Sequence, residues 1–206
     1  MFPSYEINPV PYDCTTGRPS EYPVQHFDSL YKAHEEELIL NNSRIRLIMG
    51  HYDYGARVYN SRDIIILRNP IERAWSEWRH HFQNINSKSA WGKATEGITN
   101  IKDFLDTPEG FSRLSNQQTR ILCGERWSGS PYSLNVARYN LNQSIVGVTS
   151  KLNLFVQKIS EKFLLPYISL PVTNSVRNFE IPKDIYSLLR QLNQDDLELY
   201  HIALSI

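Results

Sequence analysis

The sequence predicts a single α/β domain with a mostly parallel sheet, and three segments lead to this prediction. Residues 64–67 (Ile-Ile-Ile-Leu) form an unbroken apolar and mostly β-branched run, which is typical of a strand buried on both faces of a parallel sheet. Residues 144–149 (Ser-Ile-Val-Gly-Val-Thr) also indicate a buried strand and lead into an amphipathic helix at 151–165. A further strand is expected at 44–49. The 206 residues are enough for one domain with a substantial core.

The strand at 64–67 leads into a helix with almost no loop between them. Asn69 can cap this helix, Pro70 fits its first position, and Glu72 can complete a capping box. Arg68 is thereby placed at the carboxyl end of a strand and beside a helix N-terminus, where open α/β sheets bind anions. One face of the helix is apolar at helical spacing and is expected to pack on the sheet: Ile71, Ala74, Trp75, Trp78 and Phe82.

Arg68 and Ser76 are candidate ligands of a phosphate group. A guanidinium offers planar, charge-assisted donors, and a serine hydroxyl farther along the helix adds a neutral one. The alternative is that Arg68 pairs with a carboxylate such as Glu72 and that Ser76 is an ordinary serine of the helix surface. Both interpretations are open from the pattern alone.

His51 is the candidate catalytic residue. It follows Gly50 at the end of the strand expected at 44–49, which is a place where α/β domains carry reactive groups. A structural role for this histidine is the alternative. Asp53 could orient the imidazole or could be a solvated turn residue.

Composition narrows the classes of function. The chain has 22 Lys and Arg against 22 Asp and Glu, which argues against a dedicated nucleic-acid binder and weakly against an enzyme acting on a densely sulfated polymer. No apolar run approaches the ~20 residues of a membrane span. Residues 1–27 carry five prolines without an apolar period and are expected to form an extended N-terminal arm. Further helices are expected at 28–42, 101–106, 114–124, 133–143, 182–192 and 194–204, and a loop over the cleft at 83–99.

Several of these segments together resemble one enzyme family. Residues 68–74 (Arg-Asn-Pro-Ile-Glu-Arg-Ala) with Ser76 resemble the segment by which sulfotransferases that use 3′-phosphoadenosine 5′-phosphosulfate (PAPS) bind the 3′-phosphate of that nucleotide. The Gly50-His51 pair is similar to the segment of Golgi-type carbohydrate sulfotransferases of the heparan or dermatan uronyl 2-O kind, whose histidine is the catalytic base. Residues 114–124 and 146–150 resemble two further elements of the same group.

The resemblance implies a three-layer, phosphate-loop-nucleotide-hydrolase-like fold and transfer of a sulfuryl group from PAPS to a hydroxyl, with a carbohydrate as the expected acceptor. It implies that Arg68 and Ser76 hold the 3′-phosphate, that His51 is the base, and that Arg177, in a loop closing over the nucleotide, adds a phosphate contact; a surface arginine is the alternative for Arg177. No metal is needed. A Golgi lumenal location is implied if an anchor lies upstream, and a cytoplasmic one otherwise.

The sequence departs from the family in two places. The family's N-terminal strand and its phosphate loop of the Pro-Lys-Thr-Gly-Thr-Ser kind, whose amides and lysine grip the 5′-phosphosulfate, are not found, and are expected just upstream of Met1 if the chain is truncated. Ser150 stands where the family has a glutamate. The alternative function is therefore a truncated, non-catalytic sulfotransferase-like binding domain.

Overall fold

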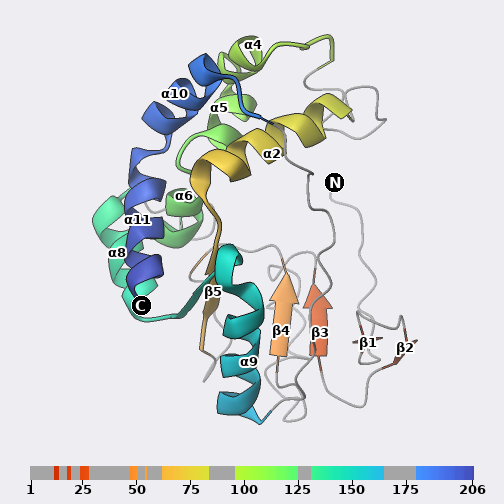
Figure 1. The fold of residues 1–206 in the computed structure, drawn as a ribbon, viewed down its shortest axis with the longest axis vertical. Helices are drawn as coiled ribbons and strands as arrows, with labels where there is room; N and C mark the ends of the chain where they lie inside the picture. The colour runs from red at the N-terminus through yellow and green to blue at the C-terminus, as the bar shows by residue number, and fades with distance from the viewer. Residues whose placement is uncertain are drawn as a thin grey trace.

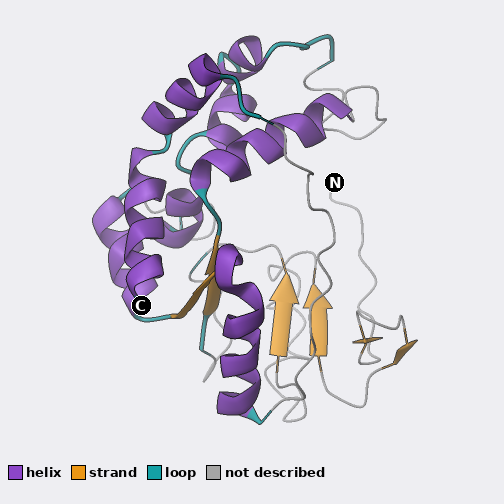
Figure 2. Ribbon diagram, in the orientation of Figure 1, coloured by secondary structure: helices purple, strands orange, loops and turns teal. Residues whose placement is uncertain are grey.

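The chain folds into a mixed α/β structure in which helices predominate (Figure 2). The computed structural model describes residues 12–13, 18–19, 24–27, 47–50, 54, 62–83, 96–124, 131–164 and 180–206, and for the strands up to residue 50 it describes the backbone alone. No helix in these ranges is long and apolar enough to cross a bilayer.

The described strands form three two-stranded sheets, two of them parallel. The antiparallel pair comprises β1 (Tyr12–Asp13) and β2 (Arg18–Pro19). The parallel pairs are β3 (Val24–Phe27) with β4 (Leu47–Gly50), and β5 (Ile64–Leu67) with β6 (Ile145–Val148). In Figure 1, β3, β4 and β5 run in one direction, so their carboxyl ends face the same side of the molecule. The predicted α/β class and parallel pairing are confirmed, whereas one continuous sheet is not formed by the described strands.

One strand was not predicted, and one prediction about a strand was wrong. Within residues 1–27, predicted to be an extended arm, the structure describes β3, whose Val-Gln-His-Phe sequence has no apolar period and which pairs with β4 over four residues. The segment 64–67 was predicted to be buried on both faces, but Ile66 is 45% exposed and Leu67 only 3% exposed. The strand β5 therefore packs mainly through the side on which Leu67 lies.

The helices follow the sequence pattern closely. The helix expected at 101–106 ends before Pro108, and Pro108 occupies the first turn of the next helix, where the missing N–H of proline costs nothing and Thr107 Oγ1 accepts from the Gly110 N–H at 2.9 Å. The described helices are α2 (Pro70–Gln83), α4 (Ile101–Leu105), α5 (Pro108–Leu114), α6 (Gln117–Cys123), α8 (Leu134–Asn142), the 3₁₀ turn η1 (Thr149–Lys151), α9 (Leu152–Phe163), α10 (Lys183–Leu192) and α11 (Gln194–Ser205).

The segment predicted as one helix at 114–124 is two helices. The chain turns at Ser115 and Asn116, and Asn116 adopts the left-handed conformation (φ 42°), which asparagine tolerates better than most residues. Gly124 ends α6 in the same conformation (φ 75°), as expected for a helix stop.

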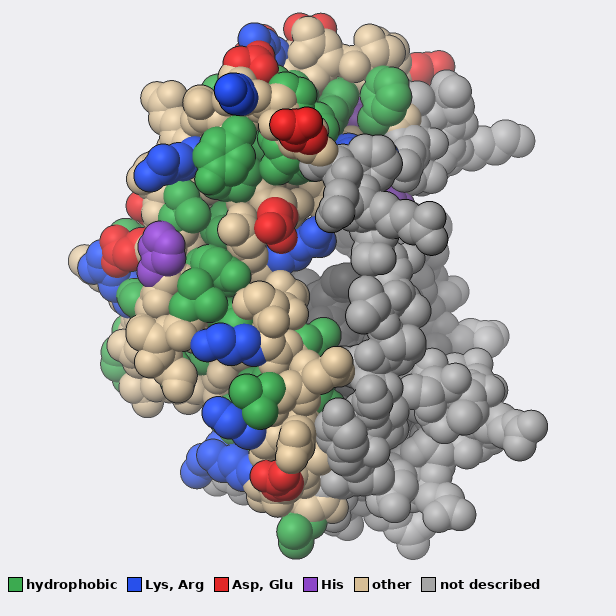
Figure 3. All heavy atoms as spheres, in the orientation of Figure 1, with side chains coloured by type: hydrophobic (Ala, Val, Ile, Leu, Met, Phe, Trp, Pro, Cys, Tyr) green, Lys and Arg blue, Asp and Glu red, His purple; other side chains and the backbone are tan. Residues whose placement is uncertain are grey.

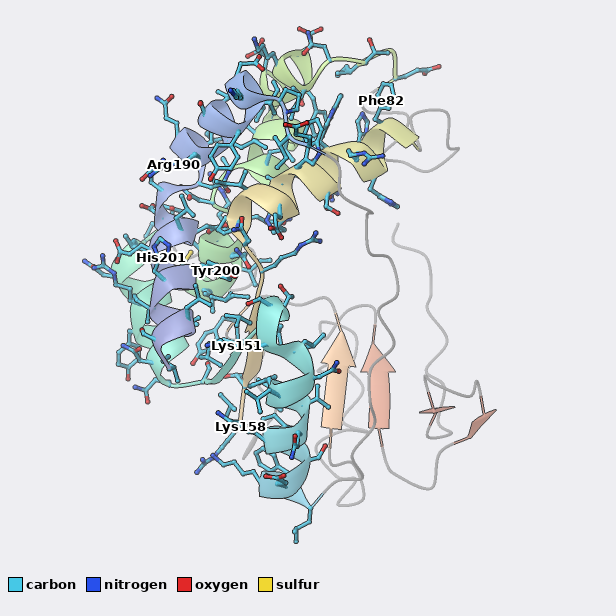
Figure 4. The ribbon with its side chains drawn as sticks, in the orientation of Figure 1. Phe82, Lys151, Lys158, Arg190, Tyr200 and His201 are labelled. Carbon is cyan, nitrogen blue, oxygen red and sulfur yellow. The ribbon has the colours of Figure 1, made fainter. Side chains whose placement is uncertain are left out.

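The buried apolar residues form two clusters. Cluster 1 joins α6, α8 and α11 to the ends of β5 and β6: Leu67, Leu122, Cys123, Ala137, Leu141, Val148, Leu199, Tyr200 and Ala203. Cluster 2 joins α2, α4, α5 and α10: Ile71, Ala74, Trp78, Ile101, Phe104, Leu114, Ile185 and Leu189. Helix α9 covers β6, and its Phe155 ring packs so closely over Gly147 that a Cβ there would lie 2.4 Å from the ring. On α11, Tyr200 turns toward the side of α9 and His201 turns outward (Figure 4).

His81 is a buried histidine of α2 beside cluster 2. Its ring is fully buried, stacks on Phe104 with 4.5 Å between ring centroids, and lies 5.5 Å from Trp78. Burial lowers its pKa and the nearby Arg113 cation lowers it further, while Glu77 and a hydrogen bond with the backbone of Ile98 raise it. The folded chain therefore disfavours the charged imidazole.

This burial predicts a loss of stability in acid. Because the pKa of His81 is lower in the folded state than its usual value of 6.5, the unfolded chain binds the extra proton first, and the free energy of unfolding should fall as the pH drops below about 6.5. His81→Phe should remove up to about 1.4 kcal/mol per pH unit from that slope. Urea unfolding of both proteins between pH 7 and pH 5 measures the difference, and parallel curves would contradict the assignment.

Candidate functional site

Arg68 lies directly after the last residue of β5, and its backbone is held by one side chain. The backbone N–H of Arg68 donates to Gln118 Oε1 at 2.9 Å, and Gln118 Nε2 donates to the Arg68 carbonyl at 3.0 Å. The half-buried Arg68 guanidinium makes no hydrogen bond or ion pair with any residue that the structure describes, Glu72 included. None of the described residues therefore neutralises this cation.

The N-terminus of α2 adjoins Arg68 and is capped as predicted. Asn69 Oδ1 accepts hydrogen bonds from the backbone N–H groups of Ile71 (3.0 Å) and Glu72 (3.2 Å). The second half of the expected capping box is not formed, because the exposed Glu72 side chain makes no bond back to Asn69 among the described contacts. The positive end of the helix dipole therefore adds to the charge of Arg68.

Ser76 lies in the second turn of α2, on the side opposite the helix's buried stripe. Serine in a helix often donates to the carbonyl four residues earlier, which occupies its hydroxyl. Four other serines do so here: Ser115, Ser144, Ser187 and Ser205. No such bond is made by Ser76, so its half-buried hydroxyl is not used by the described part of the chain.

Arg73, the second arginine of the segment, has a structural role. Its Nη1 donates to Gln117 Oε1 and its Nη2 donates to the Arg113 carbonyl at 2.9 Å, which ties α2 to α5 and α6. Burial lowers the pKa of Arg73 and the charge of Arg68 lowers it further, whereas Asp196 and Glu77 raise it. Arginine remains charged in proteins, so two cations lie near the end of β5 and favour an anion there.

Gln118 belongs to a buried set of hydrogen bonds that we call the polar joint. Asp196, which is 0% exposed, accepts from the Gln118 N–H (3.0 Å), the Thr119 N–H (2.7 Å) and the Thr119 hydroxyl (2.7 Å). In return, the Asp196 N–H donates to Asn116 Oδ1 at 3.2 Å. The Asn116 N–H donates to Asn193 Oδ1 at 2.9 Å. Thus Asn116 and Asp196 cap each other's helices.

Arg120 of α6 packs on aromatic rings. Its guanidinium lies 5.2 Å from the ring centroid of Tyr132 and 6.0 Å from that of Phe111, at cation–π distances. The Tyr132 hydroxyl donates to Asp195. Burial, with that carboxylate beside it, raises the pKa of Tyr132. Arg120 therefore links α6 to Phe111 of α5 and to Tyr132, the residue that bonds Asp195 beside the polar joint.

Two of the four predicted site residues belong to the described part of the chain. The structure describes Arg68 and Ser76, whereas His51 and Arg177 lie outside the described residues. His51 directly follows Gly50, the last residue of β4, and the carboxyl ends of β4 and β5 face the same side (Figure 1). On the face drawn in Figure 3, Lys or Arg side chains lie on the described surface below α2, with an Asp or Glu side chain beside them.

Comparison with known proteins finds a distant relative. No family model matches the chain. The chain is 27% identical over 193 residues to heparan-sulfate 6-O-sulfotransferase 3-B of Danio rerio, an alignment that covers 77% of this chain and 45% of the relative. The chain is a distant homologue of this sulfotransferase. It spans less than half of the relative's length. The expected likeness to 2-O enzymes in particular gains no support, since this heparan-sulfate sulfotransferase is a 6-O enzyme.

From the hydrogen bonds of the polar joint we expect that removing the Asp196 carboxylate lowers stability strongly. Asp196→Ala leaves two buried N–H groups and one hydroxyl without an acceptor, so the free energy of unfolding should fall by about 3 kcal/mol or more. Asp195→Ala, one residue away and bonded to the exposed Tyr132, should cost under about 1 kcal/mol. Denaturant unfolding of the two variants tests the contrast, and similar losses would show that the joint is not essential.

Proposed function

We propose that the chain is a PAPS-dependent sulfotransferase that transfers a sulfuryl group to a hydroxyl of a carbohydrate. The observation that carries the proposal is Arg68, a cation fixed at the end of β5 beside the N-terminus of α2 and without a carboxylate partner among the described residues. The distant homology to an enzyme named for heparan sulfate supports both the reaction and the class of acceptor.

The residues of this chain fit the 3′-phosphate of the donor nucleotide. The Arg68 guanidinium supplies charge-assisted donors, and the Ser76 hydroxyl supplies one more from the face of α2 that is turned away from cluster 2. The helix N-terminus adds a favourable field for an anion. We assign a further phosphate contact to Arg177.

We assign proton removal to His51. When bound, PAPS supplies the sulfuryl group and retains, as adenosine 3′,5′-bisphosphate, the electron pair of the S–O bond that breaks. A neutral imidazole at His51 accepts the proton of the acceptor hydroxyl while its oxygen bonds to sulfur, so the charges balance without a metal. The position of His51 one strand from Arg68 along the chain supports this role.

Removing the cation should weaken nucleotide binding selectively. Arg68→Ala should lower the affinity for adenosine 3′,5′-bisphosphate by about 10- to 100-fold, since hydrogen bonds to charged groups contribute about 1.5–3 kcal/mol each. Ser76→Ala should cost about fivefold, as expected of one neutral hydrogen bond. Isothermal titration calorimetry measures both.

Arg190→Ala is the matched control for Arg68→Ala. Arg190 is an exposed arginine on the outer side of α10 (Figure 4), so its removal should leave nucleotide affinity unchanged. Equal losses in the two variants would indicate a general charge effect and contradict the assignment of Arg68.

His51→Ala should abolish transfer and spare binding. The variant should lose sulfate transfer from PAPS to heparan sulfate by at least about 10²-fold, the usual contribution of a general base. Its affinity for adenosine 3′,5′-bisphosphate should stay within about twofold, because the imidazole acts on the acceptor. Turnover equal to that of the wild-type chain would remove His51 from the mechanism, and binding without turnover in the wild type would favour a non-catalytic binding domain.

A further inference from the structure

We propose that Gln118 is a positioning residue for the 3′-phosphate site, acting on the ligand only through the backbone of Arg68. The proposal rests on the proposed function and extends it to residues of α6 and α11. The side-chain amide of Gln118 is used at both ends: Oε1 accepts from the Arg68 N–H and Nε2 donates to the Arg68 carbonyl. Gln118 thus bonds both backbone polar groups of Arg68, as a residue of a neighbouring antiparallel strand would.

The location of Arg68 makes this contact important. The parallel pairing of β5 with β6 ends at Leu67 and Val148, and the cap of α2 begins at Asn69. Arg68 is therefore the link between two regular elements, with Gln118 fixing its backbone. Its guanidinium makes no hydrogen bond or ion pair with a described residue, so within the described part of the chain the backbone contacts of Arg68 are what fix the start of that side chain. A shift of its Cα would move the charge away from the ligand.

Gln118 is itself fixed from the C-terminal end of the chain. Its backbone N–H donates to Asp196 Oδ2 at 3.0 Å, and Asp196 is fully buried in the first turn of α11. The first turn of α6 is thereby fastened to α11, and the reach of the Gln118 amide toward Arg68 depends on that attachment. A continuous set of hydrogen bonds therefore runs from Asp196 on α11 through Gln118 to the backbone of Arg68 at the end of β5.

A purely structural role for Gln118 would have different consequences. Loss of a structural contact lowers the free energy of unfolding and weakens the binding of both nucleotides, whether or not Arg68 is present. A residue that acts through Arg68 weakens only the ligand that Arg68 holds, and only while Arg68 is present. A double-mutant cycle separates the two cases.

The experiment compares Gln118→Met, Arg68→Ala, the double variant and the wild-type chain. Met keeps the length of glutamine and removes both hydrogen bonds. Calorimetry with adenosine 3′,5′-bisphosphate and with adenosine 5′-phosphate, run well below every unfolding midpoint, reports on the 3′-phosphate alone. Gln118→Met should weaken the bisphosphate by about tenfold, leave the monophosphate unchanged, and have no effect in the Arg68→Ala background.

Gln117→Met is the matched control. Gln117 is the preceding residue on α6 and accepts from the other arginine of the segment, Arg73, so its loss should affect stability and leave bisphosphate affinity within about twofold. Gln118→Glu is a second variant, in which the acceptor for the Arg68 N–H remains and the donor to its carbonyl is lost. It should also weaken the bisphosphate selectively.

The outcomes separate the two proposals. Equal losses for both nucleotides, or a loss that persists without Arg68, would overturn the positioning role and leave the proposed function standing. Wild-type binding of neither nucleotide would overturn both, because Arg68 would then hold no phosphate. A loss caused by Gln118→Met in the wild-type background and absent in the Arg68→Ala background supports the positioning role.

Discussion

The buried carboxylate of Asp196 is the constraint on which the arrangement depends. An ionised carboxylate without solvent is costly unless donors surround it, and here two backbone N–H groups and the Thr119 hydroxyl satisfy it. Along residues 114–122 and along residues 189–199, the polar joint lies between the two apolar clusters. Leu114 and Leu189 belong to cluster 2, and Leu122 and Leu199 belong to cluster 1. The joint therefore sets the register between two hydrophobic groups that could otherwise slide, because apolar packing is not directional and hydrogen bonds are.

The two arginines of the segment 68–74 show how position decides what a charged residue does. Arg73 lies one turn into α2 and is used by Gln117 and by the Arg113 carbonyl, so its charge serves the packing of three helices. Arg68 lies before the helix, where only its backbone is engaged. The structural arginine lies close enough to Arg68 for the two charges to interact, while Asp196 and Glu77 offset part of its charge.

Local patterns predicted most elements and missed the contacts that join them. Apolar periodicity located β5, β6, α9 and both C-terminal helices within a few residues, and Asn69 was correctly predicted as a cap. The strand β3 was missed because its pairing with β4 comes from residues over twenty positions away, not from its own composition. Gln118 is buried, but its partner Arg68 lies 50 positions earlier, and the spacing of a motif carries no signal for such a pair. Asp196 is 78 positions from Gln118, and an acidic first turn of a helix is too common to single it out.

A net charge of zero is compatible with an anionic ligand because the charges are distributed unevenly. In the described part of the chain several surface cations are matched by carboxylates: Arg113 with Glu77 and Glu109, Arg138 with Glu198, and Lys102 with Asp184. Such exposed pairs contribute little to stability, but each cancels a cation as a long-range attractor. Arg68 has no carboxylate of this kind among the described residues, so a formal balance of 22 and 22 charges does not exclude the anion site that we propose at the end of β5. Positive charge can be concentrated at the end of one strand and the first turn of its helix even when the charges of the whole chain sum to zero.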